Sequence, residues 1–229
     1  MKASAIIIMG CPGSGKGTQA EILSDKFGLY YLESSKVIDG KLADIKEGDT
    51  ETVNGKEFSL VEEREKRHAG DIMSPELVTH WMKEKAKEVA SDGKKMVVAG
   101  SPRTVYEAEN FMPLLSELYG KENIVTVVID LDEEEAIYRS AHRRICSLAR
   151  HPILYFEETK DLTICPLDGS KLIVREDDNE EVIKRRMVKY RERTLPLLEY
   201  LEKEGYAIVN VKGKETPVEL HEEILEKLE

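Results

Sequence analysis

Short, mostly apolar runs alternate with segments of helical spacing along most of the chain. The apolar runs lie at 4–9, 30–32, 96–99, 124–129 and 207–211. Runs of this length without alternation are typical of strands buried on both faces of a parallel sheet. The helical segments between them are predicted at about 16–27, 35–45, 59–68, 75–91, 105–119, 132–144, 179–193, 196–203 and 217–228.

Local signals fix several boundaries. Asn54-Gly55 inside 51–59 predicts a small hairpin with a type I′ turn. Ser74-Pro75 is an N-cap followed by proline at the first helical position. Asp132 and Glu135 can cap a helix that we expect to carry Arg139, Arg143 and Arg144. Residues 146–176 lose helical periodicity and are interpreted as an inserted segment.

Strands that alternate with helices predict an α/β protein, with a parallel sheet covered by helices on both faces. Ligands of such folds bind beyond the carboxyl ends of the strands. Two glycine-containing turns, 10–15 and 100–104, follow predicted strands and therefore lie at that edge.

The turn at 10–18, GCPGSGKGT, follows an apolar strand and precedes a helix. This context distinguishes a phosphate-binding P-loop from a chance match. Its glycines let backbone N–H groups surround a polyphosphate at the helix N-terminus. Lys16 is expected to reach the β- and γ-phosphates and Thr18 to meet Mg²⁺. The expected ATP-binding residues here are Gly13, Ser14, Gly15, Lys16, Gly17 and Thr18.

Charge and composition limit the kinds of partner and the cellular compartment that we expect for this chain. The formal net charge of −11 argues against nucleic acid as a main partner. No apolar run reaches the 18 residues of a membrane span, and no signal peptide is expected before the first strand. Three cysteines predict no disulfide framework, which favours a reducing cytoplasm.

With the P-loop GCPGSGKGTQ at 10–19 and the turn GSPRT at 100–104, the chain resembles the adenylate kinase family of nucleoside monophosphate kinases. The resemblance covers nearly the whole chain. It implies a P-loop three-layer fold with a five-stranded parallel sheet and two inserted subdomains. The expected parts are a core at 1–33, 71–145 and 177–229, an acceptor-binding insert at about 34–70, and a lid at about 146–176.

The resemblance also implies an activity. The family transfers the γ-phosphoryl group of ATP, bound with Mg²⁺, to AMP, and we expect a monomer because the fold completes its site within one chain. Phosphoryl transfer is catalysed mainly by positioning and by positive charge. Arginines converging from separate elements are therefore the groups to look for.

By this resemblance, Arg103 holds the acceptor's phosphate, Arg143 and Arg175 come down with the lid, and Arg186 lies between the two nucleotides. Together with Lys16 these are the expected catalytic residues. Arg139 is expected beside the ATP base, and Asp177 and Asp178 are expected to orient the lid arginines. Four further arginines are expected at the surface or behind the site, namely Arg144, Arg185, Arg191 and Arg193.

On the acceptor side, the expected binding residues are Ser34, Lys36, Met73, Gly100, Arg103, Glu107, Arg175 and Arg186. Three positions depart from the family pattern: Ala99 and Asp39 stand where the family has an aspartate and an arginine, and Glu107 stands where a glutamine reads adenine. A carboxylate only accepts hydrogen bonds, and it would suit guanine better than adenine. Met73 is as readily explained as a core residue.

The lid contains part of a known metal pattern. Some family members bind structural zinc through two Cys-x-x-Cys or Cys-x-x-Asp pairs. Here Cys146, Cys165 and Asp168 match three ligands and Ala149 replaces another cysteine. His151 is the expected fourth ligand, with His142 as the alternative. The alternative is a metal-free lid held by hydrogen bonds.

Two alternatives to an AMP kinase stay open. Glu107 and Asp39 favour a kinase of the same fold for GMP, CMP or a deoxynucleotide. Ala99 favours a nucleotide sensor with little catalysis. A GTPase switch is disfavoured because the sequence lacks an Asn-Lys-x-Asp motif.

Overall fold

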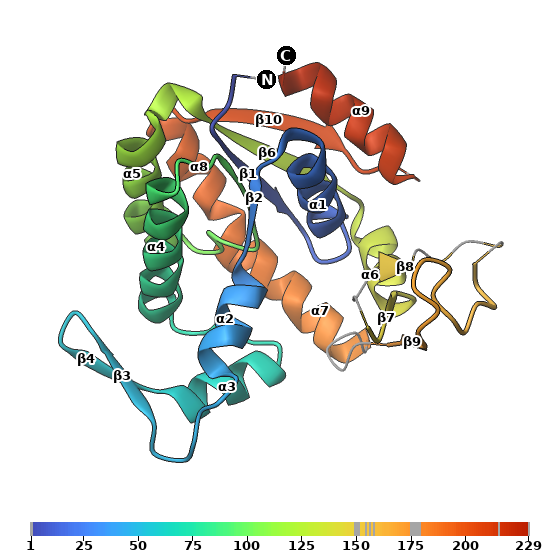
Figure 1. Cartoon of the computed structure of the whole chain (residues 1–229), viewed down its shortest axis with the longest axis horizontal. Coiled ribbons are helices and arrows are strands. Elements are labelled where there is room, and N and C mark those ends of the chain that lie inside the picture. The colour runs from blue at the N-terminus through green and yellow to red at the C-terminus, as the bar shows by residue number, and fades with distance from the viewer. Residues whose placement is uncertain are drawn as a thin grey trace.

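A five-stranded parallel sheet forms the centre of the molecule (Figure 1). The structure is a computed structural model that describes residues 2–148, 152, 153, 155, 157, 159–174, 180–214 and 216–228. The spatial order is β10 (Ala207–Lys212), β6 (Ile124–Asp130), β1 (Ala5–Gly10), β5 (Met96–Ala99) and β2 (Tyr30–Glu33). The predicted α/β class and the parallel sheet are confirmed.

The register aligns the carboxyl ends of the strands. Gly10 is opposite Ile129, and Ile8 is opposite Ala99, which in turn is opposite Glu33. The turns after β1 and β5 therefore meet at one edge, as predicted from the apolar runs.

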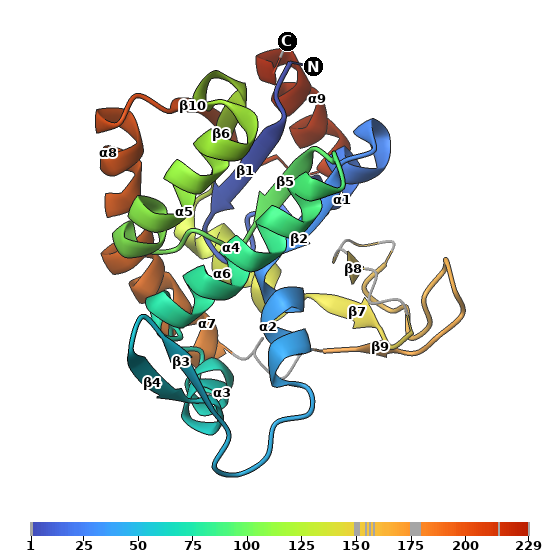
Figure 2. The same ribbon diagram turned by 60° about the vertical axis from the view of Figure 1, so that its left-hand side comes forward.

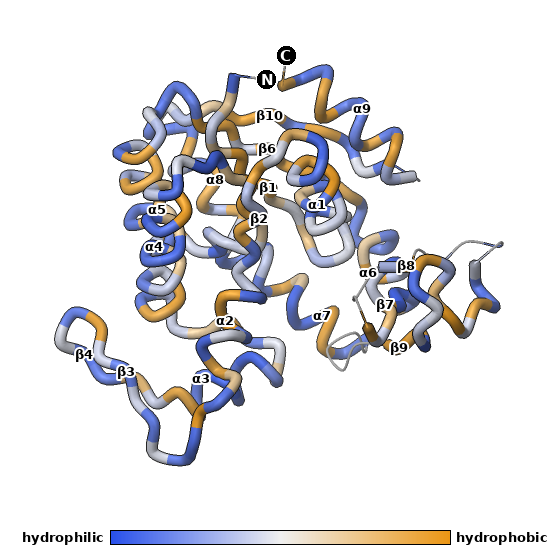
Figure 3. The backbone as a smooth tube through the Cα atoms, in the orientation of Figure 1, coloured by the Kyte–Doolittle hydropathy of each residue, from blue (hydrophilic) through white to orange (hydrophobic). Residues whose placement is uncertain are grey.

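Alternate residues of β1 serve two separate cores. Ile6 and Ile8 face α1 (Lys16–Phe27) and α9 (Pro217–Leu228), whereas Ile7 and Met9 face the opposite layer. That layer contains α4 (Pro75–Ser91), α5 (Val105–Tyr119) and α8 (Pro196–Lys203). Figure 3 shows the hydrophobic stripes along α5 and α9 that this packing requires. A short 3₁₀ turn, Lys121–Asn123, leads into β6.

The segment between β2 and α4 forms an insert of α2 (Ser34–Leu42), a hairpin of β3 (Thr50–Val53) and β4 (Lys56–Ser59), and α3 (Leu60–His68). Asn54 and Gly55 have φ of 53° and 79°, which confirms the predicted I′ turn. The helix expected to reach about residue 45 ends at Leu42.

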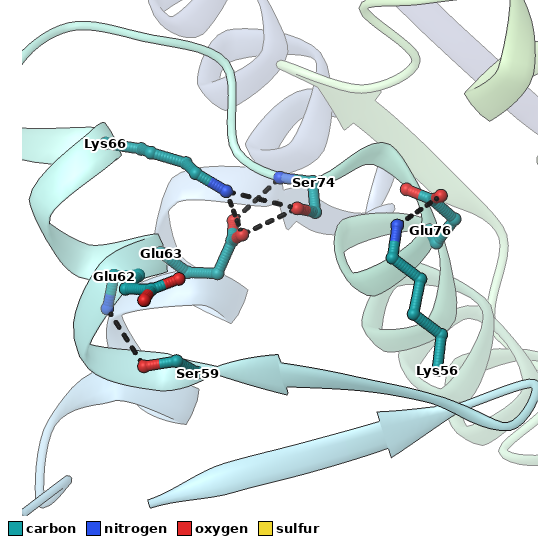
Figure 4. Close-up of polar contacts among 7 residues, drawn as sticks. All are labelled: Lys56, Ser59, Glu62, Glu63, Lys66, Ser74 and Glu76. Carbon is teal, nitrogen blue, oxygen red and sulfur yellow. Dashed lines mark hydrogen bonds and ion pairs between the residues drawn. The ribbon is translucent and has the colours of Figure 1, made fainter. Parts of the chain in front are cut away.

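A buried carboxylate attaches this insert to the core (Figure 4). Glu63 accepts hydrogen bonds from Lys66 Nζ at 2.5 Å and from the backbone N–H and hydroxyl of Ser74 at 2.7 and 2.6 Å. Burial alone would raise the pKa of Glu63, but these bonds outweigh it and the pKa is lowered. The contact fixes α3 against the start of α4.

The segment that the sequence predicts to be a lid follows α6 (Glu133–Ala141) and begins as a small antiparallel sheet. Its strands are β8 (Pro152–Ile153), β7 (Arg144–Cys146) and β9 (Leu172–Ile173). The expectation that Arg143 and Arg144 continue the helix is wrong. The helix closes at His142, because Ile145 and Cys146 are buried as strand residues between β8 and β9. Figure 2 shows the insert and the lid at the same end of the core, on either side of α2.

The helix after the lid, α7 (Glu180–Lys189), continues through a π-helical turn at Tyr190–Thr194 into α8. Such turns often mark functional sites because they redirect side chains. Among the described residues, no helix combines the length and apolarity that crossing a membrane requires.

Candidate active site

The P-loop joins β1 to α1 as predicted. Gly13 and Gly15 have φ of 83° and 88°, a region that favours glycine. A Cβ atom at Gly13 would lie 2.4 Å from the carbonyl oxygen of Ala136, so the loop packs closely on α6. No side chain of the described residues caps α1. Its first N–H groups are therefore suited to a phosphate.

The ammonium group of Lys16 is desolvated, and three arginines act on its charge. Its Nζ donates to the carbonyl oxygen of Cys11 at 3.0 Å. Desolvation, followed by repulsion from Arg186, Arg103 and Arg143, lowers the pKa of Lys16 from 10.5 to about 7. Three of the arginines predicted from sequence therefore lie close enough to act on the P-loop lysine. A polyphosphate would relieve this repulsion.

The turn after β5 presents Arg103. Gly100 has a φ of 85°, and a Cβ atom there would lie 2.4 Å from Ser34 Oγ and 3.3 Å from Arg103 Nη2. Arg103 Nε donates to the carbonyl oxygen of Gly100 at 2.6 Å, and Thr194 Oγ1 donates to the carbonyl oxygen of Arg103 at 2.9 Å. The π-helical turn thus holds the backbone of Arg103.

Glu107 braces this same turn. Its side chain is 1% exposed, and Oε2 accepts from Ser101 Oγ and from the Arg103 N–H, both at 2.9 Å. Oε1 accepts from Thr104 Oγ1 at 3.4 Å. Burial raises the pKa of Glu107, and the bonds from Arg103 and Ser101 oppose that rise. The expected contact with an acceptor base would require the carboxylate to give up these bonds.

Arg139 borders a surface groove on the other side of the P-loop. Its Nε donates to Glu135 Oε1 at 2.6 Å and its Nη2 to the carbonyl oxygen of Lys214 at 2.9 Å. The groove has a volume of about 410 Å³, and its lining residues include Asp130, Arg139 and Gly213. The ion pair orients a planar guanidinium along the groove wall.

The two lid-side arginines lie on different elements. Arg143 follows the end of α6, and Arg186 lies on α7. A Cβ atom at Gly70, just beyond α3, would lie 3.8 Å from Arg186 Cγ. The insert therefore reaches α7. Arg175, Asp177 and Asp178 lie outside the described residues.

The acceptor side only partly matches the prediction. Ser34 is buried, and its Oγ has no hydrogen-bond partner among the described residues. Lys36 pairs with Glu33 at 3.5 Å and lines a separate groove between α2 and α4, beside Tyr31. Met73 is 5% exposed within the main hydrophobic core, so the structure supports its interpretation as a core residue.

Position 39 has an unexpected partner. Asp39 Oδ1 lies 2.7 Å from Nη2 of Arg67, a residue of α3 that sequence reasoning passed over. Arg144 was also underestimated: its guanidinium donates to the carbonyl oxygens of Thr159, Lys160 and Leu162 and so holds a lid loop together. Neither pairing has a local sequence signal, because each joins segments brought together by the fold.

Three predicted metal ligands come together in the lid. The ligand atoms of Cys146, Cys165 and Asp168 all lie within 4.8 Å of one another. Cys146 Sγ donates to Asp168 Oδ2 at 3.0 Å, and the Ser170 N–H donates to Asp168 Oδ1 at 2.9 Å. The Cys146 hydrogen bond, above all, holds the pKa of Asp168 well below its usual range. His151, the expected fourth ligand, lies outside the described residues.

Comparison with known proteins gives one consistent match. The adenylate kinase family model matches residues 8–206. An adenylate kinase of Oceanobacillus iheyensis is 35% identical over 212 residues, which is 91% of each chain. One from Staphylococcus epidermidis is 32% identical over 226 residues, 98% of each chain. One from Methanosarcina barkeri is 29% identical over 219 residues, 96% of this chain and 95% of the relative.

Proposed function

The chain belongs to the adenylate kinase family and is a nucleoside monophosphate kinase, and we propose that it transfers the γ-phosphoryl group of ATP to AMP. An oxygen of the AMP phosphate bonds to the γ-phosphorus while the bond to the β,γ-bridging oxygen breaks. The bridging oxygen keeps the electron pair, and two ADP molecules result. The reverse reaction uses the same groups.

The observation that supports this proposal is that Arg186, Arg103 and Arg143 all lie close enough to Lys16 to add to the lowering of its pKa, beside the larger effect of desolvation. Two polyanions and a transferring phosphoryl group need such a concentration of positive charge. A site that only bound ATP would need fewer cations. On a chain of net charge −11, this local cluster is specific to the site.

We assign the roles as follows. Lys16 holds the β- and γ-phosphates, Arg103 the acceptor phosphate, and Arg139 the ATP base in the groove beside Gly213. Arg143, with Arg175 from the lid, neutralises the transferring group, and Arg186 bridges the two nucleotides. Asp177 and Asp178 orient the lid arginines.

The proposed division of the chain follows these roles. The core is 1–33, 71–145 and 177–229, the acceptor-binding insert is about 34–70, and the lid is about 146–176. Closure of the insert and the lid would exclude water, which otherwise accepts the phosphoryl group.

Mg²⁺ accompanies ATP in this family, and when bound it neutralises charge on the β- and γ-phosphates. The residues present fit a metal held mainly by the nucleotide. Thr18 offers one hydroxyl beside Lys16, whereas the end of β5 is the buried, apolar Ala99. This suits Mg²⁺, which keeps several of its waters.

We also propose that the lid binds structural zinc. Two thiolates and one carboxylate form a suitable donor set, and Ser170 already orients Asp168. His151 is the proposed fourth ligand. We further propose a monomer in the cytoplasm, where the buried thiols of Cys11, Cys146 and Cys165 would stay reduced.

The test is a phosphotransfer assay with ATP, Mg²⁺ and a panel of AMP, GMP, CMP, UMP and their deoxy forms. We expect turnover of AMP far above the others and loss of all turnover in Lys16→Ala. If another monophosphate were turned over faster than AMP, that nucleotide and not AMP would be the acceptor. ATP binding without transfer to any acceptor would contradict the proposal and indicate a nucleotide sensor.

A further inference from the structure

An ion pair between Arg67 and Asp39 connects the two helices of the insert, α3 and α2. Arg67 Nη2 lies 2.7 Å from Asp39 Oδ1 and donates to the carbonyl oxygen of Ser35 at 3.5 Å. The Arg67 side chain is 27% exposed and the Asp39 side chain 66% exposed. The guanidinium is therefore sheltered, while its carboxylate partner faces solvent.

Two contacts link the segment that carries Arg67 to the elements that carry Arg103 and Arg186. On one side, α2 begins with Ser34. A Cβ atom at Gly100 would contact both Ser34 Oγ and Arg103 Nη2, so these two atoms lie close to the same turn. On the other side, Gly70, three residues after Arg67, lies against Val182 and Arg186 of α7. Arg67 contacts Ser35, the neighbour of Ser34, and its helix ends beside Gly70, so the segment that carries Arg67 touches both α2 and α7.

The insert holds Arg67 in this position. Glu63, one turn earlier on α3, bonds to Ser74 at the start of α4 (Figure 4). The end of α3 is therefore anchored, and the guanidinium is presented from a fixed backbone. An anchored donor loses less conformational entropy when a ligand binds.

The chemistry of the pair suits an exchangeable anion. An ion pair whose carboxylate is mostly exposed is weak, so a doubly charged phosphate can compete with Asp39. A guanidinium has five N–H donors in a planar fork that matches phosphate oxygens. The buried hydroxyl of Ser34, which has no hydrogen-bond partner among the described residues, lies at the start of the same helix as Asp39.

We propose that Arg67 binds the phosphate of the acceptor nucleotide together with Arg103, and that Asp39 holds its guanidinium in place until the acceptor arrives. This inference rests on the proposed function, because it assigns a residue to the acceptor subsite of that reaction. It also explains how an aspartate is tolerated at position 39: the positive charge comes from α3 instead of α2.

The experiment compares Arg67→Met with the full-length wild type and with Lys56→Met as a matched control. Lys56 belongs to the same insert, lies on β4 and pairs with Glu76 of α4 at 3.1 Å (Figure 4). The dissociation constant of AMP is measured by calorimetry without ATP, and KM values for AMP and ATP by phosphotransfer. We expect Arg67→Met to raise the dissociation constant of AMP by about 10- to 100-fold, which is the effect of losing one charge-assisted hydrogen bond. The KM for ATP should stay unchanged. Lys56→Met should match the wild type.

A second comparison separates phosphate binding from a merely structural tie. If Arg67 only neutralised Asp39, its removal would cost nothing once Asp39 is Asn. We expect Asp39→Asn/Arg67→Met to bind AMP about 10-fold or more weakly than Asp39→Asn alone. Equal affinities of these two variants would overturn the proposal.

The acceptor panel completes the test. Loss of a phosphate contact lowers kcat/KM for AMP, GMP and CMP by a similar factor. A changed preference among the bases would place Arg67 at the base and overturn the assignment. A wild type that binds AMP without transferring phosphate would contradict the proposed function alone, because the calorimetric comparison still decides the role of Arg67.

Discussion

Replacing Glu107 tests whether the Arg103 turn is held by a buried carboxylate. In Glu107→Ala, the Arg103 N–H and the Ser101 hydroxyl lose their acceptor in a site that is 1% exposed. Each unsatisfied buried donor costs about 1 to 3 kcal/mol. We therefore expect a loss of about 3 kcal/mol and, for a chain of this size, a melting temperature lower by about 6 to 12 °C.

Glu107→Gln is the matched variant. The amide oxygen can replace Oε2 and accept from Ser101 and Arg103, and the amide NH₂ can donate to Thr104 Oγ1, which lies 3.4 Å from Oε1. All partners stay satisfied, so the turn and Arg103 should keep their positions. We expect less than about 1 kcal/mol of change and nearly wild-type turnover.

The pH dependence of the folding stability independently tests the direction of the pKa shift of Glu107. Burial, the largest influence, raises the pKa of Glu107 in the folded state. The ionised carboxylate is then less favourable in the folded than in the unfolded chain, so it destabilises the fold at pH values above its folded pKa. Glutamine lacks this effect. The stability of Glu107→Gln relative to wild type should therefore be greatest near pH 8 and fall as the pH drops through the folded pKa.

The assay is thermal unfolding followed by circular dichroism between pH 4 and 8, with phosphotransfer measured on the same samples. An alanine variant that melts with the wild type would show that the turn does not depend on this carboxylate. A glutamine variant as damaged as the alanine variant would show that the charge itself is needed. Stabilisation by glutamine that grew toward low pH would refute the pKa argument.

Three further predictions concern the phosphate groups and the lid. ATP binding should raise the pKa of Lys16 from about 7 toward 10.5, so that the protein binds as much as one additional proton near pH 8. Calorimetry in buffers of different ionisation enthalpy measures this proton uptake. A binding heat that is the same in all buffers would contradict the prediction. Arg103→Ala should lower turnover of AMP by roughly 100-fold or more while the dissociation constant of ATP stays within about twofold, and unchanged turnover would remove Arg103 from the site. Purified protein should contain about one zinc per chain, which Cys146→Ser should lose together with thermal stability; a metal-free protein whose melting is unaffected by the substitution would exclude the zinc proposal.

Features encoded by neighbouring residues could be predicted from the sequence. The Asn54-Gly55 turn and the strand 96–99 depend on backbone geometry and on burial over a few residues, and both are found as expected. The reciprocal cap of Thr216 and Glu219 on α9 is equally local. Motif spacing likewise brought Lys16 and Arg103 to one sheet edge, because parallel strands end together.

What the sequence could not show is the direction in which a side chain faces. Glu107 lies in the first turn of α5 and could equally face a ligand or the turn before the helix. Its direction depends on the hydrogen bonds from Ser101 and the Arg103 N–H. Met73 is buried because α4 packs on the sheet. Arg67 and Asp39 are 28 positions apart, and only the folding of the hairpin brings α3 back onto α2.

The distribution of the arginines explains why closure and chemistry belong together. Arg103 is held by the core through Thr194, whereas Arg67 lies on the insert and Arg143 at the start of the lid. Without nucleotides, Arg103 and Arg143 repel Lys16, since both contribute to the lowering of its pKa. We expect this repulsion to favour an open arrangement of the ligand-free site. Two bound polyanions reverse the sign of that interaction. In the proposed mechanism, the same charges that oppose an empty closed state would stabilise the filled one, so that water would be excluded only when both substrates are present.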